Sequence, residues 1–77
     1  MTEQELIKIG FEKESTDEGS HYYTFEIGGM TFITNQCSDE VVDDNWTVDV
    51  FDNDTFVIST SMDMLDLITI LERNLKQ

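Results

Sequence analysis

The sequence is poor in cysteine, in cationic side chains and in long apolar runs, and each shortage excludes a class of protein. The single cysteine, Cys37, excludes an internal disulfide framework and predicts an inert thiol in a reducing compartment, an intermolecular bridge being the alternative. No run approaches the roughly 20 apolar residues that span a bilayer, and the acidic residues 2–5 predict no signal peptide. We therefore expect one small soluble domain over residues 1–77, located in the cytoplasm.

Positive charge is especially scarce. Four Lys and Arg residues stand against 17 Asp and Glu, which gives a formal net charge of −13, and no Lys or Arg lies between Lys13 and Arg73. A field of one sign repels nucleic acid and anionic lipid and attracts basic proteins, so we expect no direct nucleic acid binding and no membrane contact. The alternative is that the acidity serves solubility only.

The clearest structural signal is a β-hairpin over residues 22–34. Gly28 and Gly29 separate two β-prone runs, and two-residue hairpin turns need the positive φ that glycine reaches without strain. The turn predicts three cross-strand pairs on one face: Ile27 with Met30, Phe25 with Phe32, and Tyr23 with Thr34. Because side chains alternate along a strand, a slip of one residue would exchange the two faces, so the pattern specifies its own register.

Helices are predicted at both ends of the chain. Thr2 and Glu5 have the spacing of a capping box, and Gly10 suits the left-handed position that ends a helix. The polar residues 12–21 predict a connecting loop. A longer helix is predicted over about residues 62–75, capped by Thr60 or Ser61.

A second hairpin is predicted between the loop 35–45 and the C-terminal helix. Residues 46–51 and 55–59 flank a turn at 52–54. A three-residue loop predicts Val48 opposite Ile58, Val50 opposite Phe56 and Trp46 opposite Thr60. The resulting α+β fold is a four-stranded antiparallel meander with a short N-terminal helix and a longer C-terminal helix. The aromatic face should meet the C-terminal helix, while the face with Ile33, Phe51 and Val57 is either covered by the N-terminal helix or exposed.

No spacing of residues predicts catalysis, a metal site or a cofactor. The acidic turn at 52–54 fails as a calcium loop because Phe56 and Val57 occupy positions that need an oxygen ligand and a glycine. His21 has no second histidine or cysteine nearby, so it is a poor metal ligand and is expected at the surface or a strand edge. We therefore expect a protein that is not an enzyme and needs no cofactor. Weak divalent binding at Asp43 and Asp44, or at Asp52 and Asp54, is left open.

Two functions are compatible with these features. The first is an acidic inhibitor that occupies the nucleic-acid groove of a basic protein, with carboxylates at the positions of phosphates. Its candidate partner-binding residues are the acids of the central region: Glu26, Asp39, Glu40, Asp43, Asp44, Asp49, Asp52 and Asp54. The second is a small assembly module that forms a homodimer through Leu67 and Ile70 of the C-terminal helix, with acidity serving solubility only.

The chain also resembles the short acidic proteins encoded by bacteriophages and mobile elements. The resemblance lies in residues 6–11 (LIKIGF), 46–48 (WTV) and 67–71 (LITIL), without a signature motif. Some anti-CRISPR and other anti-defence proteins are similar in being acidic α+β folds of this size that mimic DNA. The resemblance implies a basic effector such as a CRISPR nuclease as partner and the cytoplasm of a bacterial host as location. It transfers no individual site residue.

Overall fold

The structure is a computed structural model that describes residues 1–51 and 53–74, without the side chains of residues 53–56. Within these residues it contains two helices and one antiparallel five-stranded sheet in the order β1-β2-β3-β4-β5. The elements in chain order are α1 (Glu3–Ile9), β1 (Glu12–Ser15), β2 (His21–Ile27), β3 (Met30–Thr34), β4 (Val48–Val50), β5 (Asn53–Ile58) and α2 (Ser61–Asn74). The α+β class and the sequential meander are confirmed, but the predicted count of four strands is wrong.

The additional strand is β1, which lies inside the segment predicted as a loop. It pairs with β2 from Glu12 opposite Thr24 to Ser15 opposite His21. All four of its residues are exposed. Because β1 is an edge strand held by backbone pairing rather than by burial, its sequence carries no apolar alternation to reveal it.

The first hairpin forms at the predicted turn. Gly28 and Gly29 have φ of 59° and 81°, the positive values that a two-residue turn requires. The two inner pairs are confirmed, Ile27 with Met30 and Phe25 with Phe32. The ladder ends at Thr24 opposite Ile33, and the Tyr23 amide donates instead to the Thr34 side-chain oxygen at 3.1 Å.

The second hairpin is confirmed at only one of its three predicted pairs. Val48 lies opposite Ile58, but Val50 lies opposite Asn53 rather than Phe56, because the register shifts between Asp49 and Val50. A shift of this kind leaves extra residues on one strand and increases the local twist. The predicted three-residue loop is therefore wrong as well, since Asn53 already belongs to β5.

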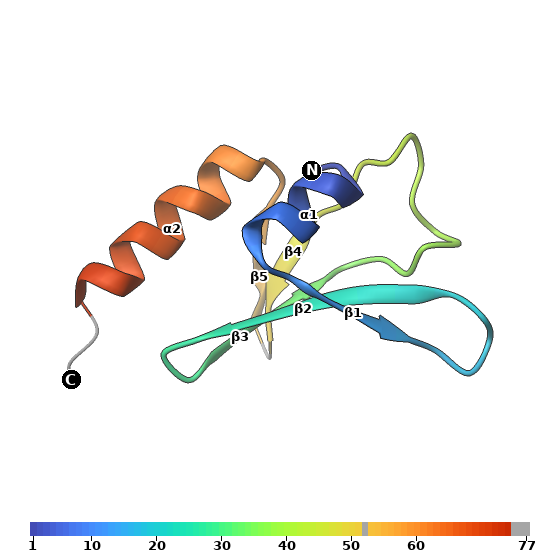
Figure 1. Ribbon diagram of the computed structural model, residues 1–77, viewed down its shortest axis with the longest axis horizontal. Helices are drawn as coiled ribbons and strands as arrows, with labels where there is room; N and C mark the ends of the chain where they lie inside the picture. Colours follow the sequence, from blue (N-terminus) through green and yellow to red (C-terminus); the bar gives the residue numbers. More distant parts are fainter. Residues whose placement is uncertain (52, 75–77) are drawn as a thin grey trace.

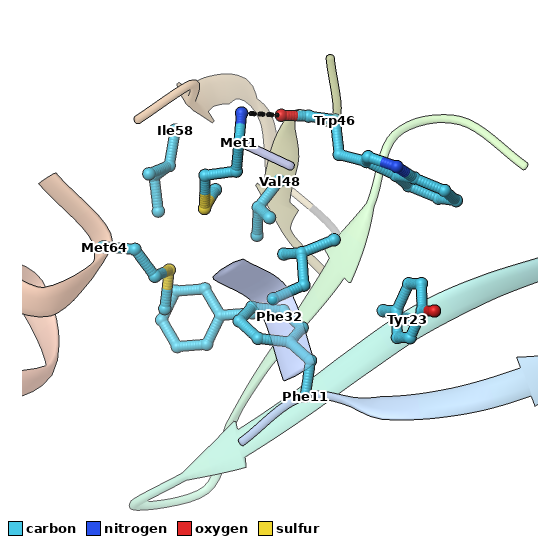
Figure 2. Close-up of a cluster of buried hydrophobic side chains, with 9 residues drawn as sticks. Met1, Phe11, Tyr23, Phe32, Trp46, Val48, Ile58 and Met64 are labelled. Carbon is cyan, nitrogen blue, oxygen red and sulfur yellow. Dashed lines mark hydrogen bonds between the residues drawn. The ribbon is translucent and has the colours of Figure 1, made fainter. Parts of the chain in front are cut away.

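Trp46 does not pair with Thr60, because Met1 lies beside it. The Trp46 amide donates to the Met1 carbonyl oxygen at 2.7 Å, and the Met1 amino group donates to the carbonyl oxygens of Trp46 and Ser59 at 2.8 and 3.0 Å (Figure 2). Buried backbone groups need partners. The Met1 backbone provides them between the two diverging strand ends.

One face of the sheet carries the core and both helices. Figure 1 shows α1 and α2 on the same side of the β2–β3 hairpin, and Figure 2 shows Met64 of α2 and Phe11, which follows α1, beside Phe32 of β3. The buried apolar residues are Met1, Leu6, Phe11, Tyr23, Phe32, Trp46, Val48, Ile58 and Met64. The aromatic face therefore meets α2, as predicted, and it meets α1 as well.

Both helices begin where the sequence predicts. The capping box of Thr2 and Glu5 is formed, and Gly10 ends α1 with φ of 120°. The Thr60 hydroxyl oxygen accepts the Asp63 amide at 3.2 Å and so caps α2. Residue 75, the predicted last residue of this helix, lies outside the described residues.

The opposite face of the sheet, here called the open face, is covered by neither helix. Alternation and register assign it Glu12, Glu14, Tyr22, Thr24, Glu26, Thr31, Ile33, Asp49 and Val57. Val57 is 52% exposed, and Phe51, which follows β4, is 59% exposed. Of the two alternatives for Ile33, Phe51 and Val57, the structure shows an uncovered face.

Candidate functional site

The carboxylates lie almost entirely at the surface. Among the Asp and Glu side chains that the structure describes, none is buried, and only Glu3, Glu5 and Asp49 are partly covered. The acids predicted to bind a partner fall into two groups. One lies in the loop between β3 and β4, and the other lies on the open face.

The loop group contains Asp39, Glu40, Asp43 and Asp44, and two of these acids also hold the fold together. The Glu40 carboxylate accepts the Cys37 amide at 3.0 Å. One oxygen of Asp44 accepts both the Trp46 indole N–H and the Glu3 amide, each at 3.0 Å. Asp44 therefore joins the loop to the start of α1 as well as contributing surface charge.

The open face brings together Glu26 and Asp49 and adds two acids that sequence reasoning did not select, Glu12 and Glu14. They were missed because β1 was predicted as a loop, so nothing assigned its side chains to a face. Asp52 lies outside the described residues. Asp54 is in β5, and its side chain is not described.

A cleft of about 540 Å³ separates the β1–β2 turn from the β3–β4 loop. His21 and Ser38 hold the two segments together, because the Ser38 amide donates to the His21 carbonyl at 2.7 Å and the His21 amide donates to the Ser38 hydroxyl at 3.0 Å. The lining residues are Thr16, Asp17, Glu18, Ser20, Cys37, Asp39 and Glu40. One ligand atom from each of Cys37, Asp39 and Glu40 lies within 4.8 Å of the others. The cleft therefore favours cations over anions.

A polar cluster around Glu3 was also missed from the sequence. One Glu3 oxygen accepts the Tyr23 hydroxyl at 2.6 Å and is hydrogen-bonded to Nε2 of the His21 ring. The His21 ring stacks on Trp46 with centroids 5.8 Å apart. Glu3 is 18 or more positions from His21, Tyr23 and Trp46, so no local spacing could reveal the cluster.

Hydrogen bonding in this cluster shifts two pKa values in opposite directions. The Tyr23 hydroxyl and then the His21 ring lower the pKa of Glu3 by stabilising its charged form. Burial, followed by the hydrogen bond to Glu3, raises the pKa of Tyr23 to about 12. Tyr23 therefore stays protonated at neutral pH and donates to Glu3, which suits a structural role better than proton transfer.

None of the helices within residues 1–51 and 53–74 has the length and apolar character needed to cross a membrane. No protein-family model matches the chain, and no curated protein or solved structure matches it.

Proposed function

We propose that this protein is a non-enzymatic acidic inhibitor that binds a basic, nucleic-acid-handling protein. The observation that supports the proposal best is that its carboxylates are exposed and lack internal counter-charges. In the described part of the chain, Glu3 contacts the ring of His21, and no lysine or arginine pairs with a carboxylate. An uncompensated field of this kind attracts a positively charged surface from a distance.

The dimensions of the molecule are consistent with occupation of a nucleic-acid groove. The chain measures 39 × 24 × 23 Å along its principal axes. Duplex DNA carries one negative charge per 1.7 Å, so a duplex 39 Å long carries about 23 charges. A net charge of −13 over the same length is within a factor of two of that density.

Within this class, a DNA-mimicking inhibitor of a phage-defence nuclease is the most specific form of the proposal. CRISPR nucleases hold their guide–target duplex in a positively charged channel. Aspartates on strands and tight loops suit such a channel, because short side chains lose little entropy when they pair with lysine or arginine. The resemblance to acidic anti-defence proteins favours the same partner class.

The test begins with capture of partners from a bacterial lysate on the immobilised protein, followed by mass spectrometry. We expect basic nucleic-acid-binding proteins that are released as salt increases and that compete with duplex DNA for the immobilised protein. For a CRISPR nuclease, guided DNA cleavage should fall as the protein is added in increasing amounts. Capture that is insensitive to both salt and DNA would contradict the proposal.

A further inference from the structure

We infer that the basic partner docks on the open face of the sheet and that one of its arginine side chains pairs with Asp49. This inference rests on the proposed function, since it identifies the surface that performs it. Three features support it: the arrangement of the open face, the environment of the Asp49 carboxylate, and the charge of the whole chain.

The open face is acidic at one side and apolar at the other. One row of cross-strand neighbours crosses all five strands: Glu12, Thr24, Ile33, Asp49 and Val57. The adjacent row runs from Glu26 to Thr31 and is continued by Phe51, whose amide donates to the Thr31 carbonyl at 2.8 Å. Carboxylates thus lie over β1 and β2, and Asp49 lies among apolar side chains over β3 to β5.

Among the described residues, Asp49 carries the one buried side-chain oxygen that has no hydrogen-bond partner. Its Oδ1 atom is inaccessible to solvent and accepts no hydrogen bond from the described residues. A carboxylate oxygen removed from water without a donor is destabilised. A small rotation of the Asp49 side chain that opens Oδ1 to a partner's donor would remove that penalty. Ile33 and Val57 flank it on the neighbouring strands.

Arginine suits this position better than lysine. Its planar guanidinium donates two parallel hydrogen bonds to a carboxylate and is more weakly hydrated than an ammonium group. Its aliphatic stem can lie against Val57 and Phe51, which are 52% and 59% exposed. An arginine anchored among apolar side chains is a common source of binding energy in protein interfaces.

A second cation is accommodated at the acidic side of the face. A hollow of about 480 Å³ lies where β2 extends beyond the start of β1. It is lined by Gly10, Glu12, Thr24, Phe25, Glu26 and Thr31. The exposed carboxylates of Glu12 and Glu26 and the hydroxyls of Thr24 and Thr31 provide oxygen acceptors for the N–H groups of a lysine or arginine side chain.

The charge of the chain favours a basic partner over a second copy. Each copy carries a net charge of −13, so bringing two open faces together opposes two strong fields of the same sign. Five strands spaced about 4.8 Å apart span roughly 20 Å, so the face is wide enough to bind a segment of a partner. Its area is smaller than the area buried in a large obligate interface.

The first test maps an arginine probe on the full chain by two-dimensional amide NMR, using octa-arginine and octa-lysine peptides as ligands. We expect octa-arginine to shift the amides of Ile33, Asp49 and Val57 most, with octa-lysine binding more weakly at the same place. Shifts distributed over all the acids, or concentrated at the Asp39 and Glu40 cleft, would overturn the inference. A dimer in sedimentation experiments without peptide that Val57→Lys dissociates would also overturn it, because the open face would then be the contact between two copies.

The second test compares matched variants. Asp49→Asn should weaken octa-arginine binding at least about fivefold, whereas Asp39→Asn, which removes the same charge from the loop, should weaken it less than about twofold. Val57→Lys changes a half-exposed residue beside Asp49 and should weaken binding without unfolding the chain. Equal losses for Asp49→Asn and Asp39→Asn would overturn the docking face but leave the proposed function intact. The proposed function fails separately, if no basic protein is captured from lysate in a salt-dependent way.

Discussion

At the scale of single residues, the carboxylates of this protein have different roles although their chemistry is the same. Asp43 and Asp44 are adjacent, exposed and share a φ of 55°, yet only Asp44 accepts the Trp46 indole and the Glu3 amide. A variant that loses Asp44 would therefore weaken the loop as well as remove charge. Binding experiments should therefore substitute acids such as Asp39 and Glu26, for which the structure shows no hydrogen bond, so that charge changes without loss of a structural contact.

The glycine variants of Asp43 and Asp44 separate these roles. Glycine tolerates a φ of 55° at either position, so backbone strain does not distinguish the two variants. Asp44→Gly should lower the free energy of unfolding by about 1–2 kcal/mol more than Asp43→Gly, because it leaves two N–H donors without an acceptor. Urea unfolding followed by Trp46 fluorescence measures the difference. Equal values for the two variants would contradict the structural role of Asp44.

Glu3 predicts a dependence of stability on pH. Its pKa in the folded protein is lowered from 4.5, chiefly by the hydrogen bonds from Tyr23 and His21. A lowered pKa contributes stability above the unfolded-state value, and this contribution is lost as the pH falls through the folded-state value. Glu3→Gln should therefore be less stable than the wild type at pH 7, by about 1 kcal/mol because the side chain is partly exposed.

The difference between Glu3→Gln and the wild type should narrow as the pH falls below about 4.5, the region in which Glu3 itself becomes protonated. Glu72→Gln is the matched control, since Glu72 is exposed on α2. Thermal unfolding at a series of pH values provides the comparison. A constant difference across the acid range would show that Glu3 stabilises the fold by some other means.

At the scale of elements, the sequence predicts best those segments in which local chemistry and burial agree. The Gly28-Gly29 hairpin, the capping box of α1 and the start of α2 all form as predicted. The strand β1 and the register of β5 differ from the prediction. Strand β1 is stabilised by backbone pairing without burial. The register of β5 is shifted at Asp49 and Val50 by a bulge, and no residue type in the sequence predicts a bulge there.

Two phenylalanines test which face of the sheet is buried. Phe32 is fully buried on the core face, whereas Phe51 is 59% exposed. Phe32→Ala should lower the free energy of unfolding by about 3–5 kcal/mol, enough to unfold much of a small domain. Phe51→Ala should change it by less than about 1 kcal/mol. Chemical denaturation distinguishes the two, and a large loss for Phe51→Ala would mean that the open face is covered.

At the scale of the whole molecule, the net charge of −13 should make both the stability of the fold and the affinity for a partner depend on salt concentration. The described lysines and arginines form no ion pair with a carboxylate, so repulsion among the acids is reduced mainly by salt. Salt should therefore stabilise the isolated protein and weaken its complex with a basic partner.

The melting temperature should rise by several degrees between about 0.02 M and about 0.5 M NaCl as self-repulsion is screened. Replacing Glu14, Glu26 and Asp39 by their amides should raise the melting temperature at low salt and reduce its dependence on salt. Differential scanning calorimetry measures both effects. A melting temperature that does not change with salt would show that the acids do not repel one another appreciably.

The alternative of a homodimer predicts a different behaviour in solution. Leu67, one of the two residues predicted for that contact, packs partly against the core, and Ile70 is 52% exposed. We expect sedimentation to give a monomer of 8.9 kDa at low salt. If a dimer is found, Ile70→Glu should dissociate it.

The sequence by itself determined the α+β class, the first hairpin and its register, both helix starts and the large negative net charge. Each of these depends on residues that are close along the chain or on composition alone. Only the tertiary structure decided that α1 and α2 share one face, that β1 extends the sheet, and that Asp49 Oδ1 on the open face is buried without a hydrogen-bond partner among the described residues. These features depend on contacts between distant segments, such as the Met1 backbone beside Trp46 and Ser59. Alternation assigns a strand two faces, but only the packing of the helices determines which of them stays open.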